Sequence, residues 1–161
     1  MKLSSIQDAL LAEIEDLYSA EQQLLEVLPK MAAKATSAKL KAGFETHLKE
    51  TQGHVERLEQ VFEILGEKPK AQTCKAMKGL LAEGKEVMEE DATPEVMDAF
   101  LIAAAQKVEH YEIASYGTVC TWAEVAGFPE AKELLGKTLN EEELTDQKLS
   151  ALSKTINKKA S

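Results

Sequence analysis

The chain has 161 residues, 44% of them hydrophobic, and a formal net charge of -9. This length supports one domain with a substantial core, and it is short for two. The acidic charge repels phosphate backbones, so nucleic-acid binding is not expected. Aromatic residues make up only 5% of the chain, while Ala, Leu, Glu and Lys dominate, so residue propensity favours helices over strands.

Helix signals divide the chain into four long segments and one short segment within one domain, residues 1–161. Ser4 with Gln7 has the spacing of a capping box at the start of the first helix. Pro29 lies late in that helix and predicts either a kink or an early end. The predicted helices cover about 4–34, 37–65, 74–91, 94–126 and 129–156.

The connections between these helices predict how they are arranged. Thr93 followed by Pro94 starts the fourth helix, and Gly127 ends it. Short links join the first helix to the second and the fourth to the fifth, so each pair is expected to form an antiparallel hairpin. The 67–93 connection is long enough to run along the bundle and carries a short amphipathic helix. We therefore predict an all-α four-helix bundle with a long crossover.

Apolar residues at spacings of three and four mark the buried stripe of each long helix. In the second helix this stripe includes His47 and His54. Glu50 lies three residues after His47 and four before His54, within about 60° of the same face. Each of the four stripes has an acid near its middle: Glu21, Glu50, Glu112 and Glu142.

The negative charge of four carboxylates in one buried layer has to be neutralised. An unpaired buried carboxylate costs several kcal/mol or takes up a proton, and four of them repel one another. The stripes contain almost no Lys or Arg at these positions. Two divalent cations would cancel the formal charge of the four acids, so the pattern predicts a metal site with two ions.

Further donors lie near these four acids. Glu109 flanks the stripe of the fourth helix by one turn. His54 is a candidate direct ligand, whereas His47 either binds metal or orients Glu50. Asp146 is a candidate because it follows His54 by 92 residues, the same spacing that separates Glu142 from Glu50.

The position of the ligand in the fifth helix is open. Glu141 and Glu143 are expected on the solvent-exposed face, although either replaces Glu142 after a one-residue error in helix phase.

Cysteine use and the N-terminus bear on the compartment. Cys74 and Cys120 form no CxxC pair, which favours a reduced, intracellular protein. Acids interrupt the N-terminal segment, and no apolar run reaches transmembrane length. We expect a cytoplasmic protein without a membrane segment.

Several sequence stretches carry a resemblance that covers nearly the whole chain. These are DLYSAEQQL, HLKETQGHVERLEQVF, LIAAAQKVEHYEIASYGT and LNEEELTDQKL. Together they resemble the YciF group of bacterial stress-associated proteins, in the ferritin-like superfamily with the rubrerythrins. The resemblance implies a ferritin-like bundle with a dinuclear iron site, commonly in a homodimer. It places the family pattern on Glu21, His47, Glu50, Glu109, Glu112 and Glu142.

The chain departs from the usual di-iron signature, in which two helices each give a Glu and two others each give Glu-x-x-His. Gly53 occupies the histidine position after Glu50, and the fifth helix offers Asp146 after Glu142 or Glu143. A carboxylate-rich ligand set leaves manganese or magnesium as alternatives to iron.

Two functions are consistent with these patterns. In the first, a di-iron site oxidises Fe(II) with O₂ or peroxide as the small-molecule substrate, as a ferroxidase or peroxidase. In the second, the chain is a metal-free helical bundle for dimerisation or partner binding, without catalytic activity. Whether the protein is an enzyme is left open by the sequence.

Overall fold

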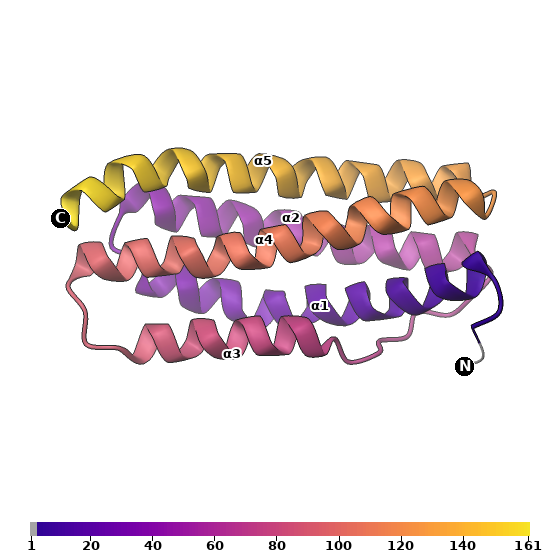
Figure 1. The fold of residues 1–161 in the computed structure, drawn as a ribbon, viewed down its shortest axis with the longest axis horizontal. Helices are drawn as coiled ribbons and strands as arrows, with labels where there is room; N and C mark the ends of the chain where they lie inside the picture. The colour runs from indigo at the N-terminus through magenta and orange to yellow at the C-terminus, as the bar shows by residue number, and fades with distance from the viewer. Residues whose placement is uncertain (1–2) are drawn as a thin grey trace.

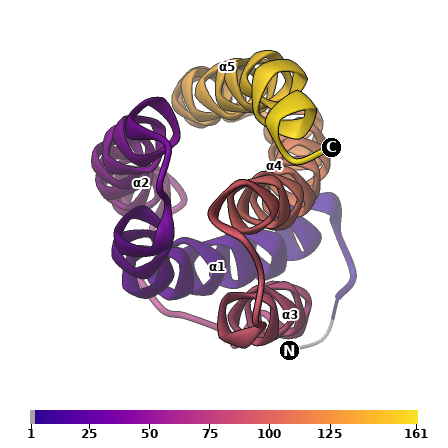
Figure 2. The same ribbon diagram turned by 90° about the vertical axis from the view of Figure 1, so that its left-hand side faces the viewer.

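The computed structural model describes residues 3–161, and all its regular elements are helices. Four long helices form an elongated bundle, while the short α3 packs outside it against α1 and α4 (Figure 1). Viewed along the bundle, α1, α2, α5 and α4 follow one another around its axis (Figure 2). The predicted all-α four-helix bundle with a crossover helix is therefore confirmed. The helices are α1 (Ile6–Lys34), α2 (Ala38–Ile64), α3 (Lys75–Glu89), α4 (Pro94–Val125) and α5 (Pro129–Lys159).

The start of α1 differs from the predicted capping box by one residue. Ser5 is the N-cap: its hydroxyl accepts a hydrogen bond from the Asp8 amide at 3.1 Å, and the Asp8 carboxylate accepts one from the Ser5 amide at 2.9 Å. The same carboxylate also accepts from the Ser4 amide at 2.8 Å. The Ser4–Gln7 box is wrong because the charged Asp8 binds both amides, a stronger arrangement than a neutral amide side chain provides.

The later part of α1 continues through Pro29 to Lys34, so the early end predicted as one option does not occur. Proline removes one backbone donor, but Leu28 and Met31 on either side of it remain buried in the core. The other predicted signals are confirmed: Thr93 caps α4 with Pro94 in its first turn, and Gly127 follows the end of α4 with a φ of 83°.

The crossover between α2 and α4 is anchored to α1. The Gln72 amide donates to the backbone oxygen of Glu15 at 3.0 Å, and the Cys74 amide donates to the Ser19 hydroxyl at 3.0 Å. These bonds fix the start of α3 beside the middle of α1.

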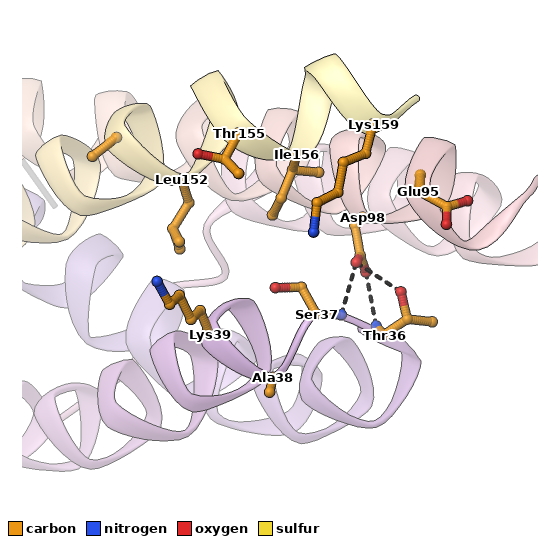
Figure 3. Close-up of a pocket in the computed structure, with 11 residues that line it drawn as sticks. Thr36, Ser37, Ala38, Lys39, Glu95, Asp98, Leu152, Thr155, Ile156 and Lys159 are labelled. Atoms are coloured by element: carbon orange, nitrogen blue, oxygen red, sulfur yellow. Dashed lines mark hydrogen bonds between the residues drawn. The ribbon is translucent and has the colours of Figure 1, made fainter. Parts of the chain in front are cut away.

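At one end of the bundle, Asp98 of α4 holds the α1–α2 turn (Figure 3). Its carboxylate accepts hydrogen bonds from the Thr36 amide at 2.8 Å, the Thr36 hydroxyl at 2.7 Å and the Ser37 amide at 2.8 Å. Asp98 is only 3% exposed, so these three bonds replace the water that burial removes.

The apolar core is divided into two clusters, with a polar layer between them. One cluster is built around Leu10, Ile14, Leu17, Leu58, Phe62, Tyr116, Val119 and Leu135. The other is built around Leu24, Leu28, Leu40, Phe44, Met77, Leu101, Val108 and Leu149. Along each long helix the acids and histidines of the stripe fall between these two clusters, so the polar layer is enclosed by apolar side chains along the bundle axis.

Candidate metal centre

Each long helix contributes side chains to the polar layer. Six residues form the layer. Glu21 comes from α1 and Glu142 from α5, while α2 provides His47 and His54 and α4 provides Glu109 and Glu112. A spacing of seven residues, about two helical turns, places both histidines of α2 on one face, and a spacing of three does the same for the glutamates of α4. All six side chains are at most 3% exposed: Glu21, His47, His54, Glu109, Glu112 and Glu142.

The six residues form two overlapping groups of donor atoms. His47, Glu109, Glu112 and Glu142 make the first group, and Glu21, His54 and Glu142 make the second. Within each group one donor atom per residue lies within 4.8 Å of all the others. Glu142 belongs to both groups, so its carboxylate lies where it could bridge two ions.

The shortest contacts in the layer join histidines to glutamates. His47 Nε2 lies 3.0 Å from Glu109 Oε1, and His54 Nδ1 lies 3.0 Å from Glu142 Oε1. His54 Nδ1 is also 3.4 Å from Glu21 Oε1. His47 Nδ1 lies 4.0 Å from Glu142 Oε2, so both histidines face carboxylates from two helices.

Despite these short distances, many donor atoms of the layer lack a hydrogen-bond partner. Within residues 3–161, every buried side-chain nitrogen or oxygen without such a partner belongs to the same six residues. Both oxygens of Glu112 and both oxygens of Glu142 are among them. Buried polar groups are nearly always paired, so this concentration of unpaired atoms sets the polar layer apart from the rest of the buried core.

The electrostatics of the metal-free layer favour protonation of its histidines. Burial alone would lower the pKa of His54, but the carboxylates of Glu21 and Glu142 outweigh it and raise that pKa to about 10. Burial likewise opposes protonation of His47, and Glu109 as its main partner holds the pKa of His47 well above its usual value.

Two glutamates of the layer also tend to hold protons. Burial raises the pKa of Glu142 to about 8, although the nearby His54 imidazole acts in the opposite direction. Burial and then the negative charges of Glu142 and Glu21 raise the pKa of Glu112 well above its usual value. The layer without metal thus retains protons that ligands must lose when a cation binds.

Residues outside the layer orient its ligands. His54 Nε2 lies 2.8 Å from Glu141 Oε2, and Arg57 donates to both oxygens of Glu141 at 2.7 and 2.8 Å. Arg57 also donates to the Thr138 hydroxyl at 3.1 Å. On the opposite side, the Tyr116 hydroxyl donates to Glu21 Oε1. Such contacts fix ring and carboxylate orientation.

Sequence reasoning missed this support. Glu141 was expected on the solvent-exposed face, yet its side chain is 27% exposed and hydrogen-bonded at both oxygens. Arg57 is not among the residues that the sequence pattern marks as part of the site. A signal was available, because Arg57 is the only arginine of the chain and lies one turn after His54.

The structure brings six of the eight predicted site residues together and leaves Glu50 and Asp146 outside both groups. Glu50 is 26% exposed, with Oε2 at 3.8 Å from His47 Nδ1. Asp146 is 19% exposed and binds Gln106 at 3.1 Å and the exposed His110 at 3.3 Å. Glu143, the alternative to Glu142, is exposed.

The donor set of the layer is chemically suited to divalent transition metals. Imidazole nitrogen suits iron and zinc, whereas carboxylate oxygen suits manganese and magnesium. A layer with two histidines and four glutamates combines both donor types, and the negative charge of the glutamates favours cations of high charge.

Comparison with known proteins places the chain in a family. The sequence model of the family described as "Domain of unknown function (DUF892)" matches residues 5–161. Protein YciF of Escherichia coli (strain K12) is 49% identical over 162 residues, covering 99% of this chain and 98% of that protein.

Solved structures agree with the predicted fold. The crystal structure of the E. coli stress protein YciF superposes with a TM-score of 0.94 at 47% identity, covering 98% of this chain and 99% of that one. A structure described as ferritin like, diiron-carboxylate proteins from Bacillus anthracis str. Ames superposes with a TM-score of 0.72 over 94% of this chain and 99% of that one. At 18% identity the second match shows the fold alone, and the fold is ferritin-like. Within residues 3–161 no helix is both long and apolar enough to span a bilayer.

Proposed function

This chain belongs to the DUF892 family, and we propose that it is a stress-response protein whose buried histidine–glutamate layer binds two divalent metal ions. His47, Glu109 and Glu112 would hold one ion, and Glu21 and His54 the other, with Glu142 shared. The observation that carries this proposal is the set of buried donor atoms without hydrogen-bond partners, all of which lie in this layer.

Iron is the metal we expect, with manganese or magnesium as alternatives. Two histidines in the layer favour iron over magnesium, since magnesium prefers an all-oxygen environment. When bound, two ferrous ions would supply the two electrons that, together with two protons, convert one hydrogen peroxide to two waters. The proposed activity is therefore oxidation of Fe(II) with O₂ or peroxide, of the ferroxidase or peroxidase type.

The residues of the chain have separate roles in this proposal. The two apolar clusters exclude water from both axial sides of the layer. Glu141, positioned by Arg57, would accept a hydrogen bond from the Nε2–H of His54, which would leave Nδ1 free to face a metal ion. The Tyr116 hydroxyl donates a hydrogen bond that fixes one oxygen of Glu21. Hydrogen bonds of this kind raise ligand basicity and set ligand geometry.

The test is the metal content per chain, measured by elemental analysis of untagged protein from cells grown with iron and manganese. We expect about two metals in the wild type, the loss of both in Glu142→Ala and the loss of one in Glu21→Ala. Asp146→Asn is the matched control, because Asp146 lies outside both donor groups and should leave the metal content unchanged. The absence of metal even after anaerobic loading with Fe(II) would refute the proposal.

The metal-free alternative has an observation of its own. Protonated His47 and His54 can pair with the surrounding glutamates at distances of 3.0 to 3.4 Å, so the layer has a way to balance part of its charge without a cation. A folded, metal-free wild type whose unfolding temperature is insensitive to added Fe(II) would favour this function, a bundle for dimerisation or partner binding.

Two further parts of the proposal concern assembly and location. We propose that the chain forms a homodimer and acts in the cytoplasm without a nucleic-acid partner, consistent with its net charge of -9. Analytical ultracentrifugation of metal-loaded protein measures the first part directly. A monomer at micromolar concentration would refute it.

A further inference from the structure

A pocket of about 280 Å³ opens between α2 and α5 and reaches α4 at its inner end. Most of its wall surface is apolar, and the apolar residues that line it are Ala42, Gly43, Phe44, Ala105, Leu149 and Leu152. Ligand pockets of proteins commonly have 300–1,000 Å³, apolar walls and a few placed polar groups. At about 280 Å³ this pocket is slightly smaller than that range, so a ligand that fills it is a small molecule.

The inner end of the pocket is formed by residues of the polar layer. His47 and Glu109 line it and are 3% and 1% exposed. His47 Nδ1 and Glu109 Oε2 have no hydrogen-bond partner. Since these are a buried nitrogen and a buried carboxylate oxygen, the inner end can bind one hydroxyl group, or a ligand that approaches the metal beside them.

The rim of the pocket is polar and close to neutral in charge. Glu50, Thr46, Thr145 and Lys148 line it, and the Thr145 hydroxyl lies 3.4 Å from Glu50 Oε2. One carboxylate and one ammonium balance each other, so the rim does not require a charged ligand. The pocket as a whole therefore matches a neutral molecule with an apolar body and a single hydroxyl at one end.

We propose that this pocket, defined as the α2–α5 pocket, binds a small alcohol or phenol with an apolar body, with its hydroxyl directed at His47 and Glu109. The inference rests on the proposed function in one respect: His47 and Glu109 form the inner wall of the pocket, and the proposed function also makes them metal ligands. It goes beyond that function because O₂ and peroxide need no apolar chamber of this size. The α2–α5 pocket would place an organic molecule directly beside the metal centre.

A larger cavity of about 620 Å³ at the end of the bundle lacks the features that indicate a ligand site. Asp98, its most buried acidic side chain, has both oxygens occupied by Thr36 and Ser37 (Figure 3). No buried unpaired donor faces a ligand there among the residues that the structure describes.

The test is a titration of full-length protein loaded with diamagnetic Zn(II), using 4-methylphenol, 4-ethylphenol and 4-propylphenol. Binding is followed by NMR of ¹³C-labelled leucine methyl groups. We expect the signals of Leu149 and Leu152 to shift while Leu135, in the other apolar cluster, does not. Each added methylene should tighten binding by about fourfold, the effect of burying one methylene at about 0.8 kcal/mol.

A blocking variant and a matched control make the test specific. A Cβ at Gly43 would meet no atom within 4 Å, and Gly43 lines the pocket, so Gly43→Leu has room to extend into the cavity. It should weaken phenol binding at least tenfold without unfolding the chain, because leucine is a better helix former than glycine. Gly136→Leu, with equally open space in α5 but outside the pocket, should leave binding unchanged.

The outcomes separate this inference from the proposed function when metal content is measured on the same samples. Metal uptake without any shift of Leu149 or Leu152 would overturn the pocket inference alone. Phenol binding that Gly43→Leu does not weaken would overturn it as well, since the ligand would then lie elsewhere. Phenol binding at the pocket with no metal uptake would support the pocket and overturn the metal site.

Discussion

The stability of the metal-free protein should fall as the pH rises from about 6.5 to 10, because His54 loses a proton that the folded state binds more tightly. His54 faces acids from two helices: Glu21 of α1, and Glu141 and Glu142 of α5. The rings of Tyr116 from α4 and of His47 from α2 also lie near it, each at 6.4 Å between centroids. Burial opposes protonation of His54, but Glu21 and Glu142 outweigh it and raise the pKa of His54 from 6.5 to about 10.

The sign of the effect follows from proton linkage. Below pH 6.5 the imidazole is protonated in both states, and the stabilisation is complete. Between 6.5 and about 10 only the folded state retains the proton, so the free energy of unfolding falls by about 1.4 kcal/mol per pH unit. From pH 7 to pH 9 this amounts to about 3 kcal/mol. Glu142, with its pKa raised to about 8, adds a loss of the same sign between its unfolded pKa and pH 8.

The assay is urea unfolding of chelator-treated protein at pH 7, 8 and 9, followed by circular dichroism. Metal-loaded protein should not show this decline, because bound ligands have already lost their protons. His54→Gln keeps a hydrogen-bonding side chain but cannot titrate, so its decline should be shallower than that of the wild type. A free energy of unfolding that is flat or rises with pH in the metal-free wild type would refute the reasoning.

Three substitutions test contacts around the layer and the turn. Arg57→Gln removes the hydrogen bonds that hold Glu141 and should weaken metal affinity by about 10–100-fold. Competition with a chelating dye measures this affinity, and an unchanged value would show that the Arg57–Glu141 pair is not needed to orient His54. Tyr116→Phe removes the hydroxyl donor of Glu21 and should lower the free energy of unfolding by about 1–2 kcal/mol with metal content unchanged, as urea unfolding and elemental analysis would record. Asp98→Ala removes three hydrogen bonds from the α1–α2 turn and should lower the free energy of unfolding by about 3 kcal/mol, as measured with urea. A loss below about 1 kcal/mol would contradict the role of Asp98 in holding the turn.

The fold was predictable from the sequence because its signals are local. Thr93 with Pro94 and the glycine at position 127 mark the ends of α4, and apolar spacing marks its buried face. The capping box was misplaced by one residue because Ser4 and Ser5 are both good caps, and only the position of Asp8 decides between them. The anchors of the crossover, such as Gln72 on Glu15, join residues far apart in sequence and have no local signal.

The polar layer was predictable only in part, since helical spacing gives the face of a residue but not its depth. Glu50 lies between two buried histidines in sequence, yet its side chain extends to the rim of the α2–α5 pocket. Glu109 was placed at the edge of its stripe and instead lies at the centre of a donor group. A shift of a few tens of degrees around a helix separates these outcomes, and that shift depends on helix packing, which the sequence does not specify.

The two proposed metal positions are unequal in access, so we expect metal to leave them at different rates. The position of Glu21 and His54 is closed by the pair of Arg57 and Glu141 and by the ring of Tyr116. The position of His47 lies at the inner end of the α2–α5 pocket.

A strong chelator should therefore remove about one metal per chain rapidly and the second more slowly, with the slow phase limited by local opening of the bundle. Stopped-flow absorbance with a coloured chelator measures both phases. Gly43→Leu fills the pocket and should slow the fast phase only, whereas Arg57→Gln should accelerate the slow phase only. A single phase for both metals in the wild type would show that the pocket is not the route to the centre, and that release requires opening of the whole layer.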